Sequence, residues 1–282
     1  MWRAHLVLTK IRKKAAKLRN AYIFREKKGA IPCFWHLGSP NFGDDLNPEL
    51  LAQLLGQPVW RNKKQNTPHI LGVGSILERA NQNSIVMGSG FINSKSKLAI
   101  NPKHVFAVRG YLTKEKLGIQ EDVLLGDPAV IIPNLLNISH MPTCEIAIVP
   151  HVDSYLLYLK QFGHLCKIID PSRSLRKVVS DIASAKVILS QSLHGLVMAD
   201  AMQIPNVWIA PHEKMLGGEF KFHDYYSTTN LPKLPTHLTD ELIILEKARE
   251  PSVSAPEISL VEYQTEYVHL LKKAISLLKK YP

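Results

Sequence analysis

Short apolar runs alternate with amphipathic helical patterns along this chain from residue 31 onward. This alternation is typical of parallel sheets, because each crossover between parallel strands needs a helix that covers one face of the sheet. The alternation pauses in a loop at residues 133–142 and then resumes. We therefore predict an α/β protein with two Rossmann-like domains that face a cleft. The predicted strands are residues 31–37, 69–73, 84–87, 104–108, 122–125, 145–149, 167–169, 186–190 and 206–209, and the predicted helices are residues 47–55, 113–117, 154–162, 174–183 and 195–202.

The length of 282 residues is enough for two domains with cores of ordinary size. We expect a basic amphipathic segment at residues 1–30, an N-terminal Rossmann-like domain at residues 31–138 and a C-terminal Rossmann-like domain at residues 139–258. Residues 259–282 are expected to form a helix that packs across both domains, because its apolar residues share one face.

The net charge of +11 is concentrated at the amino terminus. Residues 1–28 hold ten of the 35 lysines and arginines and one acidic residue, Glu26. Two interpretations are open: attachment to an anionic membrane surface, or a solvated basic helix that packs on the rest of the protein. No nucleic-acid-binding module accompanies the charge, so we expect no nucleic-acid partner. In a helix, the apolar stripe would be formed by Val7, Ile11, Ala15, Leu18 and Tyr22.

The cysteines indicate a reducing compartment. Cys33, Cys144 and Cys166 are far apart and include no C-x-x-C pair, so neither a disulfide framework nor a thiolate zinc site is predicted. The chain shows no signal-peptide pattern and no apolar stretch long enough to span a bilayer. We expect a cytoplasmic protein, peripheral on the inner face of the membrane if residues 1–28 bind there.

Polar residues and glycines collect just after the predicted strands, where α/β sheets bind their ligands. After the first strand, a glycine turn at residues 36–47 leads into a helix, which suits an anion. Asn41 and Asp44 are candidates for contact with a sugar acceptor, and Asp44 or Asp45 is a candidate base toward a sugar hydroxyl. The alternative is that one of the two aspartates only caps the helix near Asn47.

Arg109 ends a predicted strand of the first half. Its guanidinium could bind a phosphate or a carboxylate through two parallel hydrogen bonds, or it could form an ion pair with a nearby carboxylate. Gly74, Ser75 and Gly90, in turns after two other strands, could add backbone donors for the same anion.

In the second half, Ser192, Leu193 and His194 follow a strand at the start of a helix. His194 could donate to a phosphate or transfer a proton, since histidine titrates near neutral pH, or it could only cap its own helix. His151 follows a neighbouring strand. A later segment mixes a cation, a carboxylate and aromatic rings that could bind a sugar or could pack as a loop, and its candidate acceptor contacts are Lys221, Asp224 and Tyr225.

Taken in order, these motifs resemble the polysaccharide pyruvyl transferase family over residues 31–226. Residues 221–226 look like the branch that acts in bacterial exopolysaccharide assembly. The motifs that carry the resemblance are residues 41–46 (NFGDDL), 72–75 (GVGS), 88–90 (GSG), 108–110 (VRG), 126–129 (GDPA), 190–196 (SQSLHGL) and 199–201 (ADA), followed by Pro205.

The resemblance implies an architecture similar to that of the GT-B glycosyltransferases and phosphoenolpyruvate as the donor. It implies a pyruvate ketal formed across two hydroxyls of one sugar, with Arg109 and His194 lining the donor site. The acceptor would be an exopolysaccharide or a lipid-linked oligosaccharide. Some members have an arginine where this chain has Ser192, and Lys214, His151 or Lys221 could replace that cation. We expect no cofactor and no metal.

Two other functions fit the same residues. One is a glycosyltransferase that uses a nucleotide sugar, since a fold does not determine the chemistry. The other is a non-catalytic protein that binds a glycan or an anion, for which Ser192 in place of a cation gives some support.

Overall fold

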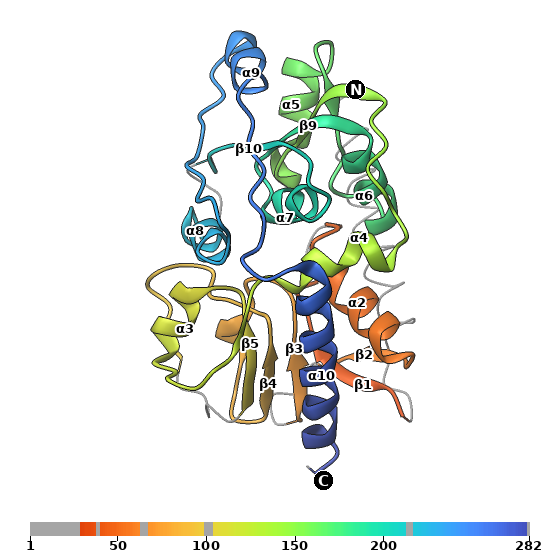
Figure 1. Cartoon of the computed structure of the whole chain (residues 1–282), viewed down its shortest axis with the longest axis vertical. Helices are drawn as coiled ribbons and strands as arrows, with labels where there is room; N and C mark the ends of the chain where they lie inside the picture. Colours follow the sequence, from red (N-terminus) through yellow and green to blue (C-terminus); the bar gives the residue numbers. More distant parts are fainter. Residues whose placement is uncertain (1–28, 38–39, 63–66, 99–103, 213–216, 281–282) are drawn as a thin grey trace.

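The structure is a computed structural model, and it describes residues 29–37, 40–62, 67–98, 104–212 and 217–280. Two parallel sheets form its centre, one with strand order β2-β1-β3-β4-β5-β6 and one with order β10-β9-β7-β8. The sheets lie one above the other in Figure 1. The predicted α/β class with two parallel sheets is confirmed. The predictions for residues 1–28 and for Lys214 lie outside the described residues.

The first sheet contains the five predicted strands and one more. The additional strand, β2, pairs in parallel with β1 and was missed because it has only three residues between two polar segments. The loop predicted at residues 133–142 begins with a short helix, because Pro133 occupies a first-turn position where no amide donor is needed. The elements of this half are β1 (Ile31–Phe34), α2 (Leu46–Leu55), β2 (Val59–Arg61), β3 (His69–Leu71), η1 (Leu77–Arg79), β4 (Ser84–Met87), β5 (Val105–Val108), α3 (Tyr111–Leu117), β6 (Leu124–Leu125), η3 (Pro128–Ile131) and α4 (Ile132–Leu135).

The second sheet contains the four predicted strands with their helices. Two short helices, α8 and α9, were not predicted, since each has only seven residues and α8 is aromatic on several sides. The elements of this half are β7 (Cys144–Val149), η4 (Val152–Ser154), α5 (Tyr155–Phe162), β8 (Lys167–Ile168), α6 (Leu175–Ala183), β9 (Ala185–Ser190), α7 (Leu193–Ala201), β10 (Asn206–Trp208), α8 (Phe220–Tyr226) and α9 (Glu241–Lys247).

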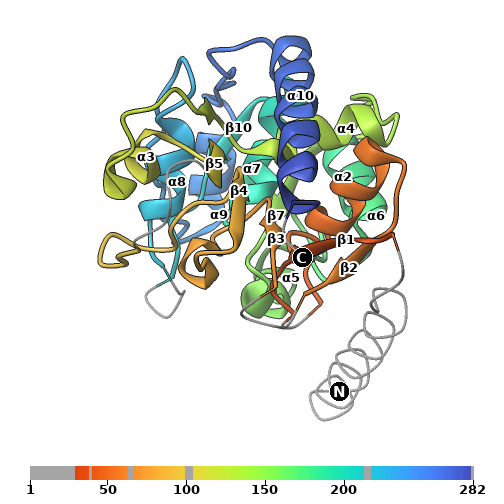
Figure 2. The ribbon, with the colours of Figure 1, turned by 90° about the horizontal axis from the view of Figure 1, so that it is seen from below.

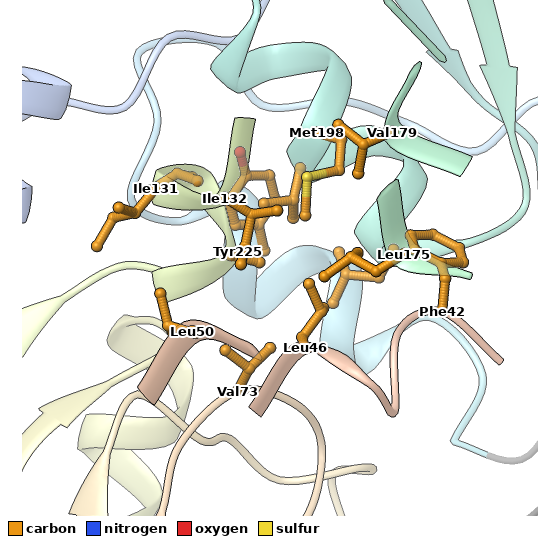
Figure 3. Close-up of a cluster of buried hydrophobic side chains, with 14 of the residues drawn as sticks. Phe42, Leu46, Leu50, Val73, Ile131, Ile132, Leu175, Val179, Met198 and Tyr225 are labelled. Carbon is orange, nitrogen blue, oxygen red and sulfur yellow. The ribbon is translucent and has the colours of Figure 1, made fainter. Parts of the chain in front are cut away.

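The two halves share one apolar core at the carboxyl ends of their strands. Phe42 and Leu46, from the first half, are fully buried in the same cluster as Leu175 and Met198 of the second half. Figure 3 shows these side chains together. The amide of Phe42 also donates to the carbonyl oxygen of Pro171 at 2.9 Å. Shared burial of this kind fixes the two carboxyl edges against each other.

The last helix, α10 (Leu260–Leu278), returns the chain to the first sheet. Its first turn is closed by a capping box between Ser259 and Glu262. The hydroxyl of Tyr263 donates to the carbonyl oxygen of Gly126 at 2.9 Å, and the hydroxyl of Tyr267 donates to that of Met87 at 2.9 Å. We expected this helix to pack across both halves; these two bonds go to the first half, and Figures 1 and 2 show α10 running along the first sheet.

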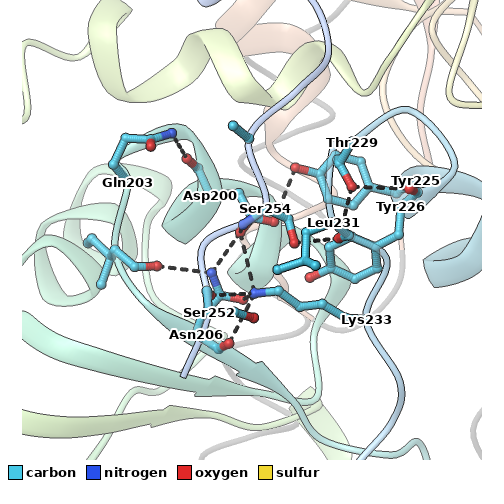
Figure 4. Close-up of polar contacts among 12 residues, drawn as sticks. Asp200, Gln203, Asn206, Tyr225, Tyr226, Thr229, Leu231, Lys233, Ser252 and Ser254 are labelled. Carbon is cyan, nitrogen blue, oxygen red and sulfur yellow. Dashed lines mark hydrogen bonds and ion pairs between the residues drawn. The ribbon is translucent and has the colours of Figure 1, made fainter. Parts of the chain in front are cut away.

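A buried polar network holds the segment that carries α8. Asp200, on α7, accepts hydrogen bonds from Asn206 (2.7 Å) and Tyr225 (3.3 Å), and the Lys233 ammonium lies 3.6 Å from its carboxylate. Ser254 donates its amide to the same carboxylate at 3.2 Å (Figure 4). Because each polar group finds a partner, the network positions α8 rather than weakening the core.

Candidate functional site

Three segments meet where the carboxyl ends of the two sheets face each other. They are the turn after β1, the start of α7 and the start of α8. Gly43, in the turn, lies so close to His194 of α7 that a Cβ at this position would collide with the ring nitrogen Nδ1. This close approach explains why the turn has glycine there, and it brings the candidate base next to the candidate histidine.

His194 lies in this interface with an unusual environment. Its ring packs edge-on against Phe42, with 6.4 Å between ring centroids. Its Nε2 atom is buried and has no hydrogen-bond partner among the described residues. Burial, and then the positive charges of Lys221 and Arg109, lower the pKa of His194 to about 3. The imidazole is therefore neutral at pH 7 and has one N–H to donate.

Asp44 is the acidic group of the interface. Burial, and then the negative charge of Asp45, raise the pKa of Asp44 to about 7, while Lys221 acts in the opposite direction. Asp45 occupies the N-cap position of α2, but its side chain makes no capping hydrogen bond. A carboxyl group with this pKa can both give and take a proton near neutral pH.

The raised pKa of Asp44 predicts a pH-dependent stability. The folded chain binds more protons than the unfolded chain between the two pKa values, so the free energy of unfolding falls as pH rises from about 4 to about 7. We expect Asp44→Asn to remove this loss and to be more stable than the wild type above pH 7, by about 0.5–2 kcal/mol. Urea unfolding of both proteins at several pH values measures the difference, which should grow with pH up to neutrality.

The neighbouring histidine does not obscure this measurement. The lowered pKa of His194 makes stability rise with pH below about 6.5, but this effect is common to both proteins and cancels in their difference. Asp122→Asn, at an exposed position, controls for the loss of one negative charge. If the difference in free energy of unfolding between wild type and Asp44→Asn shrinks as pH rises, the pKa of Asp44 is not raised in the folded protein.

Lys221 supplies the positive charge of the interface. Burial, and then the charge of Arg109, lower its pKa to about 8, while Asp44 acts in the opposite direction. The ammonium lies 5.2 Å from the ring centroid of Phe222. His151 is close enough to interact, since burial and the charge of Lys221 lower its pKa. The sequence left Lys221 open as an acceptor contact or as a donor-site cation in place of an arginine at Ser192; in the structure its charge acts on His194, His151 and Asp44.

Arg109 is fully buried and forms the ion pair that the sequence left open as an alternative. Its Nε donates to Asp224 at 2.9 Å, its Nη1 to the hydroxyl of Ser75 at 2.6 Å, and its Nη2 to the carbonyl oxygen of Phe91 at 2.6 Å. The same carboxylate accepts from the amide and the hydroxyl of Thr113, at 2.8 and 2.6 Å. Asp224, which we predicted to contact the acceptor, thus joins α8 to the residue that follows β5 and to the first turn of α3.

The glycine turns mostly make room for side chains. A Cβ on Gly72 would collide with Asn47, and a Cβ on Gly90 with the guanidinium of Arg109. Gly74 differs, because its backbone has φ of +105° and a Cβ there would meet nothing within 4 Å. Of the donor-binding glycines predicted, Gly74 is therefore the one whose surroundings are open.

The remaining predicted residues lie near the interface with other contacts. Asn41 accepts from the amide of Gly43 at 3.1 Å and shapes the turn. Ser192 is half-buried, Leu193 is buried, and Tyr225 is buried against Asp200.

Sequence reasoning missed two amide side chains that position the site. Gln191 accepts from the amide of His151 at 3.1 Å and donates to the carbonyl oxygen of Ala210 at 3.2 Å, so it joins three loops at the edge of the second sheet. Asn47 bonds both backbone groups of Val73, at 2.7 and 2.8 Å. Asn47 is buried in the first turn of α2, two residues after Asp45. A polar residue at this position of a helix could have been predicted to make a structural hydrogen bond.

Within the described residues, no group of three or more His, Cys, Asp or Glu side chains could hold a metal ion. No described helix combines the length and the apolar character needed to cross a bilayer.

A family model described as polysaccharide pyruvyl transferase matches residues 41–213. The chain belongs to this family. The matched range includes Asp44, Arg109 and His194, whereas Lys221 and the rest of α8 follow it. The range matched to the polysaccharide pyruvyl transferase family therefore contains two of the three segments that meet at the interface, the turn after β1 and the start of α7.

Known proteins similar to this family member include the succinoglycan biosynthesis protein ExoV of Rhizobium meliloti, which is 31% identical over 72% of this chain and 66% of its own length. An uncharacterized protein of Acanthamoeba polyphaga mimivirus is 27% identical over 86% of this chain and 90% of its own length. A solved structure of an uncharacterized Klebsiella pneumoniae protein aligns with 82% of this chain over 98% of its own length, with 14% sequence identity and a TM-score of 0.43.

Proposed function

We propose that this protein transfers pyruvate from phosphoenolpyruvate to two hydroxyls of one sugar and releases phosphate. In this reaction the methylene carbon of the donor gains a proton, and one hydroxyl adds to the neighbouring carbon and loses its proton. The bond between that carbon and the phosphate oxygen then breaks, and the second hydroxyl adds and loses its proton. The products are a cyclic ketal and inorganic phosphate.

The observation that carries the proposal is the cluster of Lys221, His194 and Asp44 at the domain interface of a pyruvyl transferase family member. A donor with a phosphate and a carboxylate needs cations and N–H donors. It also needs one group that exchanges protons near neutral pH. The pKa of Asp44, raised to about 7, gives the cluster such a group.

We assign the roles as follows. Lys221 binds the donor phosphate, taking the place of the arginine that Ser192 replaces, and His194 donates its N–H to the same phosphate. Binding of a dianion would raise the pKa of His194 from its low value, since the anion offsets the charges of Lys221 and Arg109. Asp44 exchanges protons with the donor methylene and the sugar hydroxyls. Arg109, three of whose N–H groups are already bonded, supplies charge and orients Ser75.

For the acceptor we propose the oligosaccharide of a bacterial exopolysaccharide, in keeping with the biosynthetic role in the name of the Rhizobium meliloti relative. Such an oligosaccharide is built on a lipid carrier, so we place the reaction at the cytoplasmic face of the membrane. We also propose that the two domains form a GT-B-like pair with the donor between them.

A donor assay tests the function. The purified full chain, mixed with a lipid-linked oligosaccharide fraction from an exopolysaccharide producer, is expected to release phosphate from phosphoenolpyruvate. One labelled pyruvyl group should be incorporated into the saccharide for each phosphate that is released. Turnover of a nucleotide sugar without phosphate release from phosphoenolpyruvate would instead establish a glycosyltransferase, and binding of glycan with no turnover of either donor would establish a binding protein.

A further inference from the structure

A shallow groove of about 510 Å³ lies along the second half of α10, far from the interface described above. Phe106 of β5 and Leu277 of α10 provide its apolar part. Its other lining residues share one face of the helix at spacings of three and four, and they are His269, Lys272, Lys273, Ser276 and Lys280.

The charge of this groove is of one sign. Lys272, Lys273 and Lys280 are exposed, and none of them forms an ion pair with a described residue. The two acidic residues of α10, Glu262 and Glu266, both lie in its first half. Three uncompensated ammonium groups around apolar carbon therefore face solvent, an arrangement that favours a ligand with anionic and apolar parts.

The groove lies at the amino edge of the first sheet. Tyr263 and Tyr267 bond carbonyl groups at the carboxyl ends of β6 and β4, so α10 starts at the carboxyl edge. The helix ends at Leu278 and so continues for roughly 17 Å beyond Tyr267 at a rise of about 1.5 Å per residue. Ile31 begins β1 at the amino edge as well, because the sheet is parallel. Residues 1–28, with their ten basic side chains, join the described chain there.

We propose that this face, the groove with Lys272, Lys273 and Lys280, docks the protein on an anionic lipid surface. Lipid phosphates would pair with the ammonium groups, and acyl or glycerol carbon would contact Phe106 and Leu277. Residues 1–28 are not the occupant, since a strongly basic segment is repelled by a basic groove. A nucleic acid fits less well than a lipid, because the apolar part of the groove would contact its charged backbone.

Vesicle binding tests the proposal in the full chain. The probe is sedimentation with mixed phosphatidylcholine–phosphatidylglycerol vesicles, compared with pure phosphatidylcholine vesicles. Each basic residue near an anionic leaflet strengthens binding roughly fivefold. The triple variant Lys272→Gln, Lys273→Gln, Lys280→Gln is expected to bind the anionic vesicles on the order of a hundredfold more weakly than the wild type.

A matched variant separates this face from total charge. Lys95→Gln, Lys160→Gln and Lys177→Gln together remove the same charge from exposed positions elsewhere, and this protein should bind like the wild type. Wild-type binding by the groove variant would overturn the proposal and would assign any vesicle binding to residues 1–28. Tighter binding to duplex DNA than to anionic vesicles would also overturn it. Neither measurement uses phosphoenolpyruvate, so its outcome is independent of whether the proposed function is correct.

Discussion

Replacement of Asp224 by alanine is expected to lower the free energy of unfolding by about 3–5 kcal/mol. The change leaves the guanidinium of Arg109 fully buried without its counter-charge, and it removes two hydrogen bonds from Thr113 at the first turn of α3. Because Asp224 lies on α8 and Arg109 directly follows β5, the loss also releases a contact between segments 115 residues apart. Urea unfolding followed by circular dichroism measures the change.

An exposed helix cap is the matched control for this prediction. Asp240 accepts from the amide of Ile243 at 3.1 Å at the start of α9, and Asp240→Ala should cost about 1 kcal/mol. If Asp224→Ala does not fold, Thr113→Val is the second variant: it keeps the ion pair of Asp224 with Arg109 and removes the hydroxyl that donates to Asp224 and accepts from the amide of Phe91. A cost for Asp224→Ala no larger than that for Asp240→Ala would show that the ion pair does not hold α8.

Replacement of Lys221 by methionine is expected to reduce kcat/KM for phosphoenolpyruvate by roughly 10²–10³-fold. The substitution removes a cation that, on the proposed function, is buried against the donor phosphate. Burial and Arg109 lower the pKa of this ammonium, so the substitution should also raise the thermal midpoint of the unliganded protein. Loss of activity with gain of stability distinguishes a ligand-binding lysine from a structural one.

The pKa of about 8 for Lys221 adds a signature in the pH profile. The lysine loses its charge as pH rises through this value, so kcat/KM of the wild type should fall on the alkaline side. Lys221→Arg should retain part of the activity and move this decline to higher pH, because arginine stays charged. Lys160→Met, at an exposed position on α5, is the control and should leave kcat/KM unchanged. An unchanged kcat/KM in Lys221→Met would remove Lys221 from the site.

The fold was largely predictable because strand and helix periods are local properties. The runs at residues 84–87 and 206–209 became β4 and β10 with at most one residue of difference. The misses, β2 and α8, are elements of three and seven residues, and tertiary contacts decide the conformation of such short segments. Trp208, for example, stacks on Phe222 at 4.6 Å between centroids and fixes α8 from 14 residues away.

The site was less predictable, because a residue type does not reveal its partner. Arg109 was recognised as important, but its ion pair with Asp224 depends on a contact across the domain interface that no local pattern encodes. Gly90 was predicted to offer a backbone donor to an anion; in the structure its amide donates to the carbonyl oxygen of Gly74 at 3.0 Å, and its missing side chain leaves room for Arg109. The meeting of Gly43 with His194 likewise follows only from the way the two sheets face each other.

The return of α10 to the first sheet has a consequence for biosynthesis. Tyr263 and Tyr267 bond to residues 137 and 180 positions earlier, and α10 contacts β4 and β5. A ribosome therefore releases the second half before the first sheet receives its cover, so the later-made half can complete its folding first. Until α10 has left the ribosome, the uncovered face of β4 and β5 is an apolar surface that chaperones can bind, and a chain that ends near residue 259 would be prone to aggregation.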